Sequence, residues 1–177
     1  CGFVGRNFVH NCVKNELCSQ ITVADKSLPE ISFMNDYHEE YFNNDIVKYI
    51  QSDLAKDNHL DRVFNDKSYD YVFNLAAETR YGLPDSTYDE RCTKLSKKCA
   101  LKSKEIGVKK FIEVSTALVY KPQSKNASRE DFPTAPWTEQ STAKLKAEEE
   151  VLAVEGLDIV ILRPAFIYGI GDTSGLM

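Results

Sequence analysis

No apolar run in this sequence approaches the ~18 residues that a membrane-spanning helix requires, so we expect no transmembrane segment and no membrane partner. Basic stripes are also missing, and the net charge of −5 is spread along the chain. An acidic chain without a basic patch does not attract a phosphate backbone, which argues against a nucleic-acid partner. One short basic run falls at helical spacings and predicts a solvated helix face, with a nucleic-acid contact as the alternative: Lys94, Lys97, Lys98, Lys102 and Lys104.

Cysteine pairs with CxxC spacing are absent too, although the chain has five cysteines. An odd number of unclustered cysteines predicts free thiols in a reducing compartment, and we therefore expect a cytoplasmic protein. No cluster of histidines accompanies them, so we expect no metal site.

The apolar pattern predicts an α/β fold. Five short β-branched runs suit parallel strands buried on both faces: Ile21–Ala24, Val47–Ile50, Tyr71–Leu75, Phe111–Val114 and Ile159–Leu162. Segments with helical period separate them: Arg6–Asn15, Leu54–Phe64, Thr93–Ile106 and Ala143–Ala153. This alternation predicts right-handed βαβ units in a single domain over residues 1–177, and the proline-containing stretch Lys121–Trp137 predicts a surface loop.

The chain opens with Cys1-Gly2-Phe3-Val4-Gly5 and continues into a predicted helix. This pattern resembles the second half of a glycine-rich phosphate-binding turn. At Gly2 the absence of a Cβ lets the backbone approach a pyrophosphate, and Gly5 lets the helix pack closely. Backbone N–H groups of the turn, including those of Phe3 and Val4, would face the anion. A plain tight turn is the alternative.

Asp25 ends the next predicted strand, about 20 residues after Gly5, where an acidic side chain accepts hydrogen bonds from the adenosine ribose. Its carboxylate would repel a 2′-phosphate, so we expect NAD as cofactor and NADP as less favoured. Lys26 follows directly and would soften that preference. The alternative is an aspartate that caps a helix or forms a turn.

Further segments match one family in order and spacing. Asp53-Leu54 resembles the pair that lies along the adenine ring, and Asn74-Leu75-Ala76-Ala77 resembles a strand end that passes beneath the cofactor. Gly107–Tyr120 resembles the next helix end and strand, and Leu162–Asp172 resembles the family's Leu-Arg-Pro-x-x-x-Tyr-Gly-x-Gly-Asp, with Pro164 at the cofactor. Together these segments resemble the NAD-dependent epimerase/dehydratase group of extended short-chain dehydrogenases.

The resemblance covers essentially the whole chain and implies a doubly wound, Rossmann-like parallel sheet. It also implies that the family's first strand lies before Cys1 and that its substrate domain follows Met177, so that this chain lacks both.

In this family a tyrosine exchanges a proton with the substrate hydroxyl, and a lysine four residues later lowers the tyrosine pKa and holds the ribose. Aligning Lys144 with that lysine places Gln140 at the tyrosine position, whereas aligning Lys146 places Thr142 there. Thr116 matches the residue that orients the substrate oxygen, with a plain strand-end hydroxyl as the alternative. A glutamine cannot ionise, so we expect slow or absent family-type turnover.

A second departure falls near Cys92, where the family has a supporting asparagine. Tyr81, Tyr120 and Tyr168 are the alternative proton carriers, although Tyr120 and Tyr168 stand in segments where family tyrosines pack.

The resemblance implies NAD-dependent hydride transfer on a small-molecule substrate, a nucleotide sugar or similar secondary alcohol. The alternatives are a non-catalytic NAD(H)-binding module or redox-sensing subunit, and a steroid-type hydroxyl dehydrogenase. A homodimer through Thr93–Ile106 and Ala143–Ala153 is a further expectation.

Overall fold

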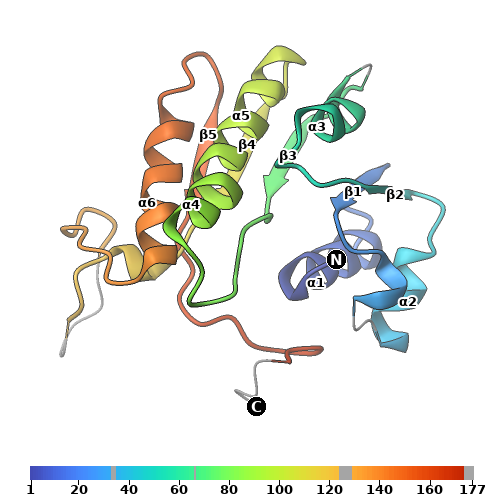
Figure 1. The fold of residues 1–177 in the computed structure, drawn as a ribbon. Helices are drawn as coiled ribbons and strands as arrows, with labels where there is room; N and C mark the ends of the chain where they lie inside the picture. Colours follow the sequence, from blue (N-terminus) through green and yellow to red (C-terminus); the bar gives the residue numbers. More distant parts are fainter. Residues whose placement is uncertain (33–34, 66, 124–128, 174–177) are drawn as a thin grey trace. The chain divides into compact units, whose positions relative to one another are not determined.

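The computed structural model describes residues 1–32, 35–65, 67–123 and 129–173. The chain divides into two compact units (Figure 1). The first comprises Cys1–Val63 with Phe166–Met177, and the second comprises Phe64–Ala165. The single domain expected over residues 1–177 stays a prediction.

The first unit is built on a parallel pair of strands. The strands β1 (Ile21–Asp25) and β2 (Val47–Gln51) pair in register from Ile21↔Val47 to Asp25↔Gln51. Its helices are α1 (Phe3–Lys14), η1 (Pro29–Ile31), α2 (Asp36–Phe42) and α3 (Asp57–Phe64), the last of which ends at the boundary of the unit. Val9 of α1 and Phe42 of α2 form the core with apolar side chains of both strands.

The second unit holds three parallel strands in the order β3 (Tyr71–Asn74), β4 (Lys110–Val114) and β5 (Ile159–Leu162). Its helical segments are α4 (Asp85–Tyr88), the π-helical turn η2 (Asp89–Lys94), α5 (Leu95–Glu105), η3 (Ala117–Val119) and α6 (Glu139–Leu152). The helices α5 and α6 lie side by side and contact the strands (Figure 1). Phe111, Val119, Ala147 and Val151 are fully buried.

The strand orders confirm the predicted fold class. A doubly wound sheet has the order 3-2-1-4-5-6. The pair β2–β1 matches positions 3-2, and β3–β4–β5 matches positions 4-5-6. Among the described residues no strand takes position 1. All five predicted strands are present, because each predicted run is short, apolar and β-branched.

Several sequence-based expectations were wrong in detail. Burial on both faces holds for the centre of β4 but not for β3, where Tyr71 and Phe73 are exposed at the edge of the sheet. The helix expected over Thr93–Ile106 is divided into η2 and α5, and the helix expected from Ala143 begins at Glu139. The described part of the loop 121–137 has no helix, and its Thr134 forms an isolated antiparallel bridge with Tyr120.

Candidate functional site

The expected phosphate-binding turn forms the N-terminus of α1. Gly2 is the N-cap residue, with φ −66° and ψ 172°, and no side chain caps this end of the helix. The first turn also contains no acidic residue. A Cβ added at Gly2 would meet nothing within 4 Å, so the backbone is open to a ligand on that side. The helix start, with Phe3, Val4 and Gly5 in its first turn, therefore suits an anion.

Asp25 closes β1 within the same unit. Its Oδ2 lies 2.8 Å from the Cys1 nitrogen, next to Gly2, and its Oδ1 accepts a hydrogen bond of 2.9 Å from the Ser27 N–H. The second contact is the turn role that the sequence left open, so Asp25 shapes the chain after β1 as well. Each carboxylate oxygen accepts about two hydrogen bonds, which leaves capacity for ribose hydroxyls. Lys26 is exposed.

Asp53 and Leu54 follow β2 and are half-buried. The Asp53 N–H donates to His59 Nδ1 at 3.1 Å, and Asp53 Oδ1 accepts from the Ala55 N–H at 3.3 Å. These contacts hold the pair in a turn before α3.

In the second unit, Leu75, Ala76 and Ala77 follow β3 and are half-buried. Asn74, the last residue of β3, is buried, and its Oδ1 accepts from the Ala76 N–H at 3.3 Å. The small side chains of Ala76 and Ala77 thus lie where the chain leaves β3, and a cofactor contact at this point stays a prediction.

The first turn of α6 places the two candidate catalytic positions on one helix. Thr138 and Ser141 form a reciprocal capping box, which fixes the start of α6 at Glu139. Gln140 and Lys144 are separated by four residues and therefore lie on the same face. Lys144 is buried, whereas Lys146, the lysine of the alternative alignment, is exposed.

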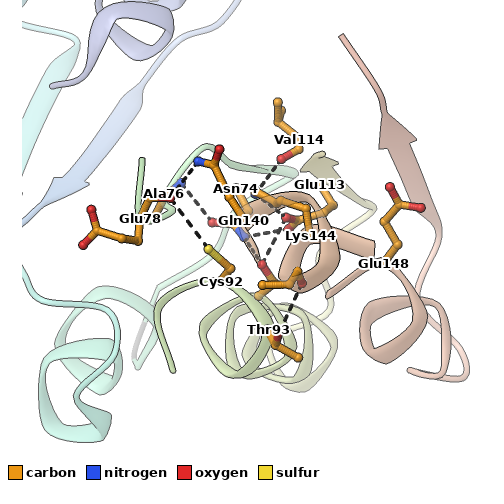
Figure 2. Close-up of polar contacts among 12 residues, drawn as sticks. Asn74, Ala76, Glu78, Cys92, Thr93, Glu113, Val114, Gln140, Lys144 and Glu148 are labelled. Atoms are coloured by element: carbon orange, nitrogen blue, oxygen red, sulfur yellow. Dashed lines mark hydrogen bonds and ion pairs between the residues drawn. The ribbon is translucent and has the colours of Figure 1, made fainter. Parts of the chain in front are cut away.

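Gln140 and Cys92, the two departures from the family pattern, share one acceptor. Gln140 Nε2 donates to the Glu78 carbonyl oxygen at 2.8 Å, and Cys92 Sγ lies 4.0 Å from the same oxygen (Figure 2). Burial raises the pKa of the Cys92 thiol, so this group is a weak proton donor and a poor nucleophile near neutral pH.

Lys144 lies in a buried polar cluster that we call the Glu113 cluster, formed by Asn74, Ser96, Glu113 and Lys144. Lys144 Nζ contacts Glu113 Oε1 at 3.2 Å and donates to the Val114 carbonyl at 2.7 Å (Figure 2). Burial raises the pKa of Glu113, although Lys144 and the hydrogen bonds from Asn74 and Ser96 oppose that shift. The candidate ribose-binding lysine thus has a carboxylate partner inside the protein.

Sequence reasoning missed Glu113. The available signal was an acidic residue within the otherwise apolar run Phe111–Val114, since a buried carboxylate requires a partner.

Thr116 stands just after β4. Its Oγ1 accepts from the Leu118 N–H at 3.2 Å and caps η3, which agrees with a structural role at the strand end. The neighbouring Ser115 Oγ is buried and has no hydrogen-bond partner among the described residues.

Arg163 and Glu148 tie the end of β5 to α6. Arg163 Nη2 lies 2.6 Å from Glu148 Oε2, and Arg163 Nη1 donates to the Tyr120 hydroxyl at 2.8 Å. The hydrogen bonds to Glu148 raise the pKa of Arg163. Tyr120 thus packs against a guanidinium, as the sequence comparison expected for a tyrosine in this segment. Pro164, next to Arg163, is half-buried.

The model of the NAD dependent epimerase/dehydratase family matches residues 1–176. The chain belongs to this family.

Solved structures give the family fold at low identity. UDP-glucuronic acid 4-epimerase from Bacillus cereus, in complex with NAD, has a TM-score of 0.79 and 23% identity, and the match covers 95% of this chain and 55% of that chain. The dTDP-glucose 4,6-dehydratase DesIV from Streptomyces venezuelae, a double mutant with NAD and DAU bound, has a TM-score of 0.78 and 19% identity, covering 92% and 52%. The enzyme WbmG from Bordetella bronchiseptica, with NAD, has a TM-score of 0.75 and 20% identity, covering 90% and 49%.

The chain therefore spans about half the length of these epimerase and dehydratase structures. A comparison with curated proteins gave no match. Within the described ranges, no helix is long and apolar enough to cross a membrane, and no group of three or more His, Cys, Asp or Glu side chains is arranged to hold a metal ion.

Proposed function

We propose that this chain binds NAD(H) and serves hydride transfer to and from a secondary alcohol of a nucleotide sugar. The observation that carries the proposal is the uncapped N-terminus of α1, open at Gly2, with Asp25 at the end of the following strand. An open helix start favours a pyrophosphate, and a carboxylate beside it favours ribose hydroxyls. The nucleotide-sugar enzymes with related folds support the substrate class.

Asp25 also supports the choice between the two nicotinamide cofactors. Its carboxylate would lie near the adenosine ribose and would repel the 2′-phosphate of NADP. Lys26 is exposed beside it and offsets part of that repulsion.

The second unit would supply the residues that act near the substrate. When bound, NAD accepts a hydride and returns it. Lys144 would hold a ribose hydroxyl, and Thr116 would orient the substrate oxygen. Gln140 offers a hydrogen bond but no exchangeable charge, and loss of a general acid–base group typically costs about 10²–10⁴-fold in rate.

A second candidate function is NAD(H) binding without turnover, as a sensor or subunit. The contacts of Gln140 and Lys144 favour it. The Gln140 amide donates to the Glu78 carbonyl, and Lys144 is paired with Glu113, so neither group is poised to move a proton.

One experiment separates the two candidates. The full-length protein would be titrated with NADH and then incubated with NAD and UDP-sugars or dTDP-sugars, while absorbance of NADH and the sugar products are followed. Binding with product formation supports the oxidoreductase. Binding without product supports the non-catalytic module, and no binding contradicts both.

A further inference from the structure

Glu113 is a fully buried carboxylate on the central strand of its sheet. Its neighbours Phe111 and Ile112 on β4 are apolar and buried. Figure 2 shows the Glu113 and Lys144 side chains directed toward one another from β4 and α6. The Lys144 side chain is 8% exposed, and its Nζ lies 3.2 Å from Glu113 Oε1. The pair is therefore shielded from solvent.

Both carboxylate oxygens of Glu113 have partners from other elements. Asn74 Nδ2, on β3, donates to Oε2 at 2.6 Å, and Ser96 Oγ, on α5, lies 3.0 Å from Oε1. Together with Lys144 on α6, partners on β3 and α5 thus hold the Glu113 carboxylate in one orientation. Because a buried ion pair stabilises a fold weakly compared with an apolar pair of similar volume, stability alone does not account for this arrangement.

The hydrogen-bond donors of Lys144 indicate what this arrangement does. A lysine ammonium has three N–H donors. Glu113 and the Val114 carbonyl take two of them, and the third has no partner among the described residues. A lysine side chain is a point charge on a flexible stem, so a fixed partner is needed to aim that donor.

We infer that Glu113 is a positioning residue, which holds the Lys144 ammonium at the end of β4 so that one N–H remains for a ribose hydroxyl of NAD(H). It also supplies the counter-charge that Gln140 cannot supply. This inference rests on the proposed function, because the hydroxyl belongs to the proposed cofactor.

Proton uptake by Glu113 provides a readout that a purely structural role would not give. The titratable groups around its carboxylate are Lys144 on α6, the Cys92 thiol on η2 and the Cys99 thiol on α5. Burial raises the pKa of Cys99 to about 12, so Lys144 is the charged partner near neutral pH. As pH falls through the raised pKa of Glu113, the carboxylate becomes neutral and its hold on Lys144 weakens. NAD affinity then falls.

The test uses the full-length protein and the variants Glu113→Gln, Lys144→Met and Glu113→Gln/Lys144→Met. Dissociation constants for NADH are measured by titration, and acetylation rates of Lys144 by acetic anhydride are measured by mass spectrometry. Glu113→Gln should weaken NADH binding roughly tenfold, the effect of one hydrogen bond to a charged group, and should speed acetylation of Lys144. In the Lys144→Met background it should not weaken NADH binding further.

A matched control is Glu150→Gln. Glu150 stands on α6, the helix of Lys144, and its carboxylate pairs with Lys97 at the surface. This variant should leave NADH affinity and Lys144 acetylation unchanged. If Glu113→Gln does not fold, the NAD affinity of the wild-type protein from pH 8 downward replaces it, with a decline expected and a flat profile overturning the inference.

The results that would overturn the positioning role of Glu113 differ from those that would overturn the proposed function. Unchanged Lys144 acetylation in Glu113→Gln, or an equal loss of NADH affinity in the Lys144→Met background, overturns the positioning role. Faster acetylation together with no NADH binding by the wild-type protein overturns the proposed function and the ribose role, and leaves only the contact between Glu113 and Lys144.

Discussion

Arg163 and Glu148 form a bidentate ion pair between the end of β5 and the middle of α6. Arg163 Nε lies 3.1 Å from both carboxylate oxygens of Glu148, and Nη2 lies 2.6 Å from Oε2. A guanidinium–carboxylate fork has a narrow geometry, so this pair fixes the helix against the strand. Gln140 and Lys144 stand on the same helix, so the ion pair also helps to hold these two residues in place.

The first prediction concerns Gln140. Gln140→Tyr should raise turnover of a nucleotide sugar by about 10²–10⁴-fold, because it restores an ionisable hydroxyl four residues before Lys144. Product formation is measured with NAD present. Gln140→Phe has the ring without the hydroxyl and should give no gain. Equal rates for the tyrosine and phenylalanine variants would contradict the assignment of position 140.

Two glycine substitutions should separate ligand binding from folding. Gly2→Ala should change the free energy of unfolding by less than about 0.5 kcal/mol, because its φ is −66° and the space around an added Cβ is open. It should still weaken NADH binding roughly tenfold or more, since the methyl group lies where the backbone would approach a pyrophosphate.

Gly171→Ala is the opposite case. Its φ is +83°, and an added Cβ would lie 2.8 Å from Cε1 of the buried His38. The free energy of unfolding should fall by about 1–3 kcal/mol, measured by urea denaturation. Normal NADH affinity in folded Gly2→Ala would remove the phosphate role of the turn.

Replacing Asp25 with alanine tests the ribose contact. NADH binding should weaken by about 1–3 kcal/mol, the usual effect of losing a hydrogen-bond partner. The affinity for NADPH should not fall, because the Asp25 carboxylate no longer repels its 2′-phosphate. Asp45→Ala, at an exposed turn, is the control. Unchanged NADH affinity in Asp25→Ala would rule out the ribose role.

Substitutions at the buried pair Glu113 and Lys144 should have strongly non-additive effects on the free energy of unfolding. Glu113→Gln or Lys144→Met alone should lower the free energy of unfolding by about 3–5 kcal/mol, because each leaves one buried charge without its partner. The double variant removes both charges and keeps hydrogen-bonding groups for Asn74 and Ser96, so it should be more stable than either single variant. Urea unfolding of the four proteins gives the coupling energy. Additive losses would show that the two side chains do not interact.

Local sequence signals were sufficient for the strands, whereas the start of α6 was placed four residues too late and the choice between the Lys144 and Lys146 alignments stays a prediction. The run Ile159–Leu162 is short and apolar, and the spacing from Gln140 to Lys144 places both on one helix face. The short helix α2 was missed because its seven residues, Asp36–Phe42, are too few for a clear helical period.

The partners of the site residues could not be predicted, because they depend on tertiary contacts. Glu78 accepts from Gln140 across 62 positions of the chain, and Glu113 meets Lys144 across 31. No local pattern encodes such pairings. The acidic residue within an apolar strand was the one available hint.

The proposed NAD(H) site is best tested by calorimetric titration of the full-length protein with NADH and with NADPH. We predict tight binding of NADH and much weaker binding of NADPH, because the α1 turn accepts the pyrophosphate and Asp25 discriminates at the ribose. If neither cofactor binds, the chain has no NAD(H) site at the α1 turn and the proposed function is wrong.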